Sequence, residues 1–170
     1  NGTTALHLAL VALGITKDDE VIISNHNGAY GSFAIEYVGA KPVFIESKKK
    51  TWNIDPSLIE DRITKKTKAI MIVHIYGYAC DMNAIMKIAK KHNLKVIEDA
   101  AESHGASING KKCGTFGDIS IFSFYANKII TSGEGGAVVT NSHELAQKCR
   151  YYKNLCFKIN GPRDFQHLNI

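Results

Sequence analysis

Apolar and polar residues alternate along the chain in blocks that predict strands and helices in turn. Short continuous apolar runs are typical of strands that are buried on both faces of a sheet. We expect such strands at residues 21–23, 42–45, 69–75, 96–98, 119–124 and 137–140. Helices are expected between them, at residues 3–13, 29–38, 55–63 and 142–153 and from residue 81 onward. This alternation predicts an α/β fold with a parallel or mostly parallel sheet that helices cover on both faces.

Connections and helix ends add detail to this pattern. The strands at 119–124 and 137–140 are joined without a helical pattern, which allows one of them to run antiparallel. Gly14 and Gly39 follow the first two helices, where left-handed backbone is expected. Asp55–Pro56 starts the third helix, because an N-cap followed by proline is a preferred beginning. No repeat or change of composition marks a second domain.

Composition bounds the class of protein. The chain has 170 residues, of which 45% are hydrophobic and 22% are charged, which is enough to bury one sizeable core. The longest apolar stretch, Ala69–Tyr78, is interrupted by His74 and is too short to span a bilayer. Because no secretory signal is visible, we expect a cytoplasmic protein.

Charge and cysteine spacing exclude two further classes. The net charge of +5 comes mostly from lysines beside turns, without the arginine-rich stripe or stacked aromatic residues of a nucleic-acid surface. We therefore expect no nucleic-acid partner. The four cysteines form neither a CxxC pair nor a Cys/His zinc pattern, so we expect reduced thiols and no metal site.

Candidate chemistry is expected where the strands end, because ligands of open α/β sheets bind outside the carboxyl ends of the strands. The sequence EDAAESHG places Glu98, Asp99, Glu102 and His104 directly after the fourth strand. One of the two adjacent carboxylates must point towards the end or core of the sheet, where an ionised carboxylate needs a cationic partner. The alternative is that Asp99 caps a helix. Among the histidines, only His104 is expected near the site.

A lysine follows the next strand. The segment SFYANK ends at Lys128, and Ser123 at its start could bind an anion at the same strand end. A lysine aimed into a cleft can form a Schiff base once its pKa is lowered. The alternative, and the more common case for an isolated lysine, is exposure to solvent.

Two further segments offer ligand contacts. Asn1-Gly2-Thr3-Thr4 precedes a helix, and its free N–H groups, glycine and hydroxyls favour a phosphate, with a plain N-cap as the alternative. Tyr30, in SNHNGAYG, either lies against a flat ring or belongs to the core. A phosphate cradle, a carboxylate, an aromatic face and a lysine are together the parts that hold pyridoxal phosphate.

Seven motifs resemble, in order and spacing, those of the DegT/DnrJ/EryC1/StrS family of sugar aminotransferases. They are GTTALHLAL, VGAKPVFIE, NIDP, VHIYGYACDM, VIEDAAESHGA, GDISIFSFYANK and GEGGAVVT. The resemblance implies a fold-type I, aspartate-aminotransferase-like domain, a three-layer sandwich around a mostly parallel sheet, with pyridoxal 5'-phosphate as cofactor. Family members transfer an amino group, usually from glutamate, to a keto group of a nucleotide-linked sugar by a ping-pong mechanism. Such amino sugars enter cell-surface polysaccharides.

The resemblance also implies roles for single residues. Lys128 corresponds to the Schiff-base lysine and Asp99 to the partner of the pyridine nitrogen, and these are the two expected catalytic residues. Glu102 stands where the family often has a glutamine that contacts the phenolic oxygen of the cofactor. A carboxylate there departs from the pattern and would need its own proton or a nearby donor.

Contacts to the phosphate and ring are implied in the same way. Ser123 and the Gly2-Thr3 turn correspond to phosphate ligands. Tyr30 is the candidate stacking residue, although many members have an aromatic residue two positions earlier, where this chain has Gly28.

The resemblance further implies what lies outside this segment. Family members have an N-terminal arm, a smaller C-terminal domain and an arginine-containing stretch that reaches the phosphate of the neighbouring subunit. Residues 1–170 are therefore expected to be the large cofactor-binding domain, a fragment inactive alone, of a homodimer with shared active sites. Two alternatives stay open: a sugar 3-dehydratase with the same cofactor, in which some relatives replace the lysine by histidine, and a non-catalytic sensor.

Overall fold

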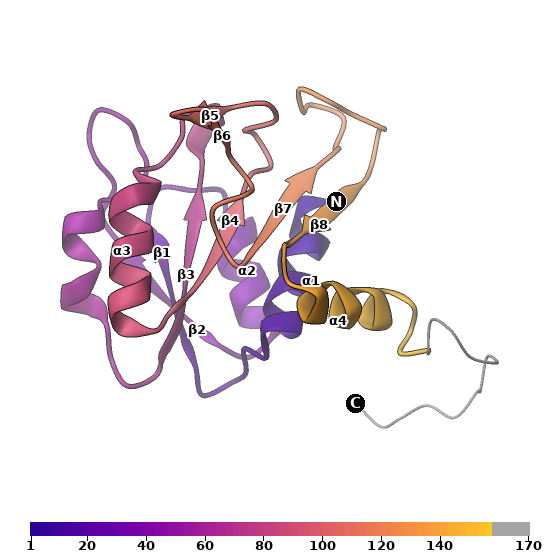
Figure 1. Cartoon of the computed structure of the whole chain (residues 1–170), viewed down its shortest axis with the longest axis horizontal. Helices are drawn as coiled ribbons and strands as arrows, with labels where there is room; N and C mark the ends of the chain where they lie inside the picture. The colour runs from indigo at the N-terminus through magenta and orange to yellow at the C-terminus, as the bar shows by residue number, and fades with distance from the viewer. Residues whose placement is uncertain (158–170) are drawn as a thin grey trace.

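A six-stranded sheet forms the central layer of the computed structural model, which describes residues 1–157 (Figure 1). From one edge to the other its strands are β2 (Lys41–Ile45), β1 (Glu20–Ser24), β3 (Thr67–Val73), β4 (Lys95–Asp99), β7 (Ile119–Ser123) and β8 (Gly136–Val139). All neighbouring pairs are parallel except β7 and β8, which are antiparallel. The mostly parallel sheet and its antiparallel member confirm the prediction from the sequence.

Helices cover both faces of the sheet and complete three layers (Figure 1). One face is covered by α1 (Gly2–Leu13), α2 (Tyr30–Tyr37) and α4 (His143–Lys153). The other is covered by α3 (Met82–His92). Ile97 of β4 packs in the first core and Val96 in the second. Because successive strand residues point to opposite faces, Asp99 lies on the α1 face and Glu98 on the α3 face.

The ends of α1 show why this segment forms a helix. The side chain of Asn1 accepts a hydrogen bond from the Thr4 N–H at 3.2 Å, and the Thr4 hydroxyl donates to the backbone oxygen of Asn1 at 2.9 Å. Gly14 ends the helix with a φ of 76°, which glycine adopts without strain, as predicted. Within residues 1–157, no helix is long and apolar enough to cross a membrane.

The segment 55–63 does not form the single α-helix that the sequence predicted. It forms two 3-10 helices, η1 (Pro56–Leu58) and η2 (Glu60–Arg62). Pro56 and Ile59 are the buried residues of this segment, so little apolar surface is available to stabilise a longer helix.

Two features after β3 and β4 also differ from the prediction. The strand expected at 69–75 ends at Val73 and is followed by a third 3-10 helix, η3 (Ile75–Gly77). A small hairpin, β5 (Ser107–Ile108) and β6 (Lys111–Lys112), follows β4. Strands of two residues carry no periodic pattern, which is why the sequence did not predict them.

Candidate active site

Residues from four separate segments line one cavity of about 450 Å³ at the carboxyl edge of the sheet. The cavity lies where the N-terminus of α1 meets the segments that follow β4 and β7. Every residue predicted to bind the cofactor, except Asp99, lines it: Gly2, Thr3, Tyr30, Glu102, Ser123 and Lys128. The remaining lining residues are Asn1, Ala101, Tyr125 and Asn127. The fold therefore brings the predicted phosphate cradle, aromatic residue and lysine together.

The N-terminus of α1 approaches β7 closely because residue 2 is glycine. A Cβ atom built on Gly2 would lie 3.1 Å from the Cβ of Ser123 and 3.4 Å from its Oγ. Any side chain at this position would push α1 away from Ser123. The hydroxyl of Thr4 is used in the helix cap, whereas that of Thr3 has no hydrogen-bond partner within residues 1–157. The free N–H groups of α1 and the hydroxyls of Thr3 and Ser123 form a site that favours an anion.

Lys128 points into the cavity rather than into solvent. Its side chain is 17% exposed, and Nζ lies 3.3 Å from Oε1 of Glu102. The other carboxylate oxygen of Glu102 accepts a hydrogen bond from the N–H of Tyr76 at 2.9 Å. Glu102 is thus held between a backbone donor and the lysine. The solvent-exposed alternative for Lys128 is not what the fold produces.

Asp99 lies just beneath the cavity on the α1 face of β4. It is 9% exposed, and its Oδ1 accepts one hydrogen bond, from the Ala101 N–H at 3.0 Å. Burial raises the pKa of this carboxyl to about 6, although the Ala101 N–H and the positive charge of Lys128 act in the opposite direction. Residues 100–106 form turns and no helix, so Asp99 is not a helix cap.

Glu98, on the other face, is the carboxylate that points into the core. It is fully buried, and its oxygens accept hydrogen bonds from three backbone N–H groups, one hydroxyl and one imidazole. These donors are Gly114 (2.8 Å), Phe116 (2.6 Å), Gly117 (2.6 Å), Ser120 (3.1 Å) and His74 (3.2 Å). Burial opposes ionisation, but the hydrogen bonds from His74, Gly117 and Gly114 outweigh it and lower the pKa of Glu98.

His74 is the imidazole partner of Glu98. Its Nδ1 accepts the Cys80 N–H at 3.1 Å, so Nε2 is the ring nitrogen that donates to Glu98. The buried carboxylate, for which we expected a cationic partner, is thus surrounded by N–H and O–H donors from several segments. The signal for this role was present in the sequence, since a histidine within an apolar run needs a buried partner.

Tyr30 is not a core residue: it is 64% exposed and lines the cavity. Its ring lies next to Gly28, where an added Cβ would be only 2.8 Å from the ring. The tyrosine ring thus occupies the space into which a side chain at position 28 would project. A ring at position 30 thus reaches the same part of the cavity wall as a side chain at position 28 would.

Two residues of the cavity lining were missed in the sequence, and His104, expected near the site, lies outside the lining. Tyr125 and Asn127 line the cavity, and their place between Ser123 and Lys128 was the available signal. His104 packs against Phe122 and Phe124, with ring centroids 5.2 and 5.7 Å away, and is absent from the cavity lining. Its two ring nitrogens have no hydrogen-bond partner within the described part of the chain.

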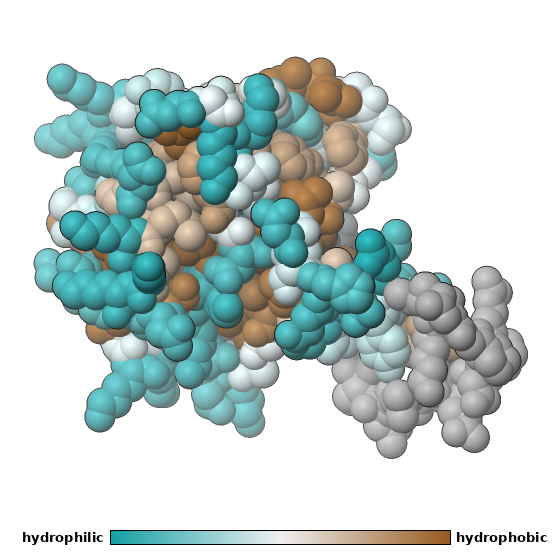
Figure 2. Space-filling model, viewed as in Figure 1, coloured by the Kyte–Doolittle hydropathy of each residue, from teal (hydrophilic) through white to brown (hydrophobic). Residues whose placement is uncertain are grey.

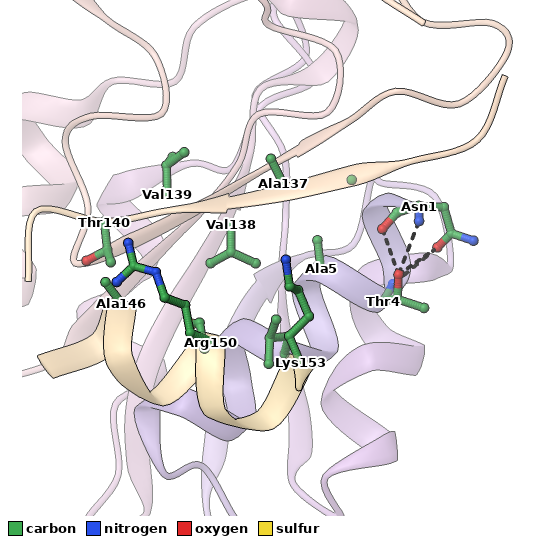
Figure 3. A pocket seen from close by; sticks show the side chains of 13 residues that line it. Asn1, Thr4, Ala5, Ala137, Val138, Val139, Thr140, Ala146, Arg150 and Lys153 are labelled. Carbon is green, nitrogen blue, oxygen red and sulfur yellow. Dashed lines mark hydrogen bonds between the residues drawn. The ribbon is translucent and has the colours of Figure 1, made fainter. Parts of the chain in front are cut away.

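A second cavity, of about 720 Å³, lies between α1, β8 and α4 (Figure 3). Arg150 and Lys153 extend from α4 towards β8, where Ala137 and Val138 form an apolar wall (Figure 3). No carboxylate lines this cavity within residues 1–157, and none of the predicted site residues does. It therefore has no lysine–carboxylate pair like that of Lys128 and Glu102 in the first cavity. Residues 1–157 also contain no group of three His, Cys, Asp or Glu side chains that could hold a metal ion.

Comparisons with known proteins show which family the chain belongs to. A sequence model of the DegT/DnrJ/EryC1/StrS aminotransferase family matches residues 1–170. GDP-perosamine synthase of Escherichia coli O157:H7 is 55% identical over 153 residues, which are 90% of this chain and 42% of that protein. The dTDP-3-amino-3,6-dideoxy-alpha-D-galactopyranose transaminase of Aneurinibacillus thermoaerophilus is 49% identical over 155 residues, 91% of this chain and 43% of that protein.

One solved structure is also similar in fold to this chain. The crystal structure of NtdA from Bacillus subtilis with bound cofactor PMP superimposes with a TM-score of 0.89 at 36% sequence identity. The alignment covers 96% of this chain and 37% of that one. The chain therefore spans less than half the length of the proteins it matches.

Proposed function

Because the chain belongs to the DegT/DnrJ/EryC1/StrS aminotransferase family, we propose that it is the cofactor-binding large domain of a pyridoxal-phosphate-dependent sugar aminotransferase. The proposed reaction moves an amino group from an amino acid, glutamate by expectation, to a keto group of a nucleotide-linked deoxy-sugar. The observation that carries the proposal is the cavity in which Lys128, Glu102 and the N-terminus of α1 meet above Asp99. Relatives named for GDP-linked and dTDP-linked sugars support the substrate class.

The residues around the cavity fit the phosphate end of the cofactor. We assign the phosphate to the N-terminus of α1, with Gly2, Thr3 and Ser123 as its ligands. Two features support this assignment. Glycine leaves room for a close approach to the helix end, and Thr3 offers a hydroxyl without a competing partner in the described residues.

The remaining contacts fit the ring. Lys128 would bond covalently to the aldehyde carbon, Tyr30 would cover one face of the ring, and Asp99 would bind the ring nitrogen. A protonated ring nitrogen beside Asp99 would favour the ionised carboxylate, whose burial otherwise raises its pKa to about 6. When bound, the cofactor supplies an electron sink for the carbon that gains or loses the amino group.

Proton transfer is the work of Lys128. Once its amine is free, Nζ can take a proton at one carbon and return it at another, as a general base and acid. Glu102 keeps Nζ at the cavity wall, 3.3 Å from Oε1. Asp99 would not move a proton, but would hold one on the ring nitrogen of a bound cofactor.

We also propose that the active enzyme is a homodimer with sites shared between subunits. Large side chains with apolar or aromatic surface are exposed near the cavity and along the loop that joins β7 and β8, and Figure 2 shows hydrophobic surface over that loop. They include Tyr76 (83%), Ile129 (72%) and Ile130 (57%). Exposed apolar surface of this kind is typical of protein interfaces, and a second copy would cover it. The expected arginine-containing stretch of the partner lies outside residues 1–157.

A cytoplasmic location is part of the same proposal. Cys80, Cys113, Cys149 and Cys156 are all unpaired within the described residues. Free cysteines are typical of a reducing compartment.

The proposal is tested with full-length protein that carries Lys128→Ala. We expect the absorbance band of lysine-bound cofactor to disappear, and amino transfer from glutamate to a panel of GDP-linked and dTDP-linked keto-sugars to be lost. Lys87→Ala, on the exposed side of α3, is the control and should retain both. An unchanged band and unchanged turnover in Lys128→Ala would refute the assignment. A deoxygenated sugar product formed without consumption of the amino donor would instead identify a dehydratase.

A further inference from the structure

Glu98 and His74 lie on the α3 face of β4, outside the cavity, yet hydrogen bonds connect them to it. His74 follows β3, is fully buried, and forms a hydrogen bond with each of its polar groups. Its N–H donates to the backbone oxygen of Asp99 at 3.2 Å, its Nδ1 accepts the Cys80 N–H, and its Nε2 contacts Glu98 at 3.2 Å. The imidazole thus joins the start and the end of the 74–80 turn to the centre of the sheet.

The middle of this turn is held from two other sides. Asn53 is buried, accepts the Ile75 N–H at 3.0 Å and donates to the backbone oxygen of Tyr78 at 2.8 Å. Gly77 has a φ of 82° and lies against the backbone oxygen of Glu102, which would be 2.9 Å from an added Cβ. Only glycine allows the turn to approach Glu102 this closely.

Tyr76 is the residue that this arrangement controls. Its backbone has φ 49° and ψ 28°, a left-handed conformation that is unfavourable for a bulky side chain, and the side chain itself is 83% exposed. The ring contributes little burial to hold the residue in place, so the surrounding hydrogen bonds must do so. The result is one N–H aimed at Oε2 of Glu102, which leaves Oε1 facing Lys128.

We propose that Glu98 and His74 are positioning residues: they hold the 74–80 turn so that the Tyr76 N–H fixes Glu102 against Lys128. Neither residue lines the cavity, and both act through the turn. The inference deepens the proposed function and rests on it for the role of Lys128. The turn supplies the donor that binds the second oxygen of Glu102, so the carboxylate is held from both sides beside the lysine.

Full-length protein with Glu98→Gln tests the inference, because the amide replaces one acceptor oxygen by a donor that faces the N–H groups. We expect hydrogen exchange of a peptide covering residues 74–80, measured without cofactor, to become roughly tenfold faster, which corresponds to about 1.4 kcal/mol. We expect kcat of amino transfer to fall by a similar factor, with KM for the amino donor little changed.

Asp118→Asn is the matched control. Asp118 accepts the Val96 N–H at 2.9 Å and pairs with Lys95 at 3.0 Å, so the same acid-to-amide change is made at the opposite end of β4. The control is expected to leave the exchange of the turn and kcat unchanged, even if it lowers the melting temperature. If Glu98→Gln does not fold, His74→Asn takes its place, because it keeps an acceptor near Cys80 but removes the contact to Glu98.

A double mutant separates positioning from simple destabilisation. If Glu98 acts through Glu102, Glu98→Gln will have little further effect on kcat once Glu102→Ala is present. Independent, multiplicative losses would overturn the inference, and so would unchanged exchange of the turn in Glu98→Gln. If the wild-type protein transaminates but these outcomes fail, only the inference is wrong. If the wild-type protein does not transaminate, the proposed function is wrong, and the exchange measurement alone decides whether Glu98 holds the turn.

Discussion

Glu98 and Asp99 are neighbours on β4, yet the two faces of the sheet give them opposite acid–base behaviour. Both are buried, with exposures of 0% and 9%. On the α3 face several N–H and O–H donors converge on Glu98 and lower its pKa. On the α1 face Asp99 accepts one backbone N–H, and burial raises its pKa to about 6. Burial raises the pKa of Asp99, whereas the larger number of donors around Glu98 outweighs the effect of burial and lowers its pKa.

The difference gives the two carboxylates different roles: Glu98 stabilises the fold, whereas Asp99 remains available to bind a ligand. Glu98 is fully satisfied by the protein, so nothing remains for a ligand to bind. Asp99 is left short of donors at the edge of a cavity, and a cationic group that enters there gains a buried partner. Underpaired polar groups of this kind are expected at binding sites.

Asp99→Asn removes the carboxylate that is available to a ligand, and we expect it to have the largest effect on activity. An amide cannot hold a proton on the ring nitrogen, so we expect kcat/KM for amino transfer to fall by roughly a thousandfold. Steady-state kinetics of the full-length protein measure this change. A loss of less than tenfold would mean that Asp99 is not the partner of the ring nitrogen.

Glu98→Gln should lower the stability of the folded protein. Two or more buried N–H groups lose an acceptor, and we expect the free energy of unfolding to fall by about 3 kcal/mol. The folded-state pKa of Glu98 is below its ordinary value, so the stabilisation is present above about pH 4.5 and is lost as the pH falls. Urea unfolding of cofactor-free protein at several pH values checks both statements. If the difference in stability between wild type and Glu98→Gln does not become smaller as the pH falls below about 4.5, the second statement is contradicted.

Asp99→Asn should have the opposite effect on stability. The folded-state pKa is raised from 3.8 to about 6, so the cost of burying the charge is absent below about pH 4 and complete above about pH 6. We expect cofactor-free Asp99→Asn to be more stable than wild type above pH 6 by about 2–3 kcal/mol, and the two proteins to converge as the pH falls. Equal unfolding curves at high pH would show that Asp99 is not destabilised by burial.

Gly2→Ala changes the start of α1, which forms another wall of the cavity. It has the smallest expected effect. The added Cβ would lie 3.1 Å from the Cβ of Ser123, so α1 must move by a few tenths of an ångström. We expect the Kd of pyridoxal phosphate to rise by roughly tenfold, with the pH dependence of stability unchanged. Absorbance titration measures the affinity. An unaltered Kd would place the phosphate away from the start of α1.

Much of this site was predictable because its residues follow strand ends. Apolar runs located the strands, and parallel strands bring their carboxyl ends to one edge, so Asp99, Tyr30 and Lys128 were expected at the same edge of the sheet. Gly2 followed from a different rule, because the N-terminus of a helix favours an anion. The resemblance to a known family then supplied roles that spacing alone does not specify.

Other features could not be predicted, because they depend on contacts between distant segments. The sequence EDAA does not say which of its first two acids meets several donors, since those donors come from residues 114–120 and from His74. The left-handed backbone of Tyr76 depends on Asn53 and Glu102, which lie more than twenty residues away. No local propensity favours such a conformation for tyrosine.

Local sequence was therefore sufficient for the order of strands and helices, for the caps of α1 and for the set of residues at the carboxyl edge. Periodicity, capping and turn chemistry act over a few residues, and their energies do not need the rest of the fold. Only the tertiary structure decided that Glu98 is a satisfied structural charge and Asp99 an underpaired one. A buried carboxylate takes its pKa from the donors that surround it, and those donors are assembled only when the sheet, the 74–80 turn and the 113–117 loop pack together.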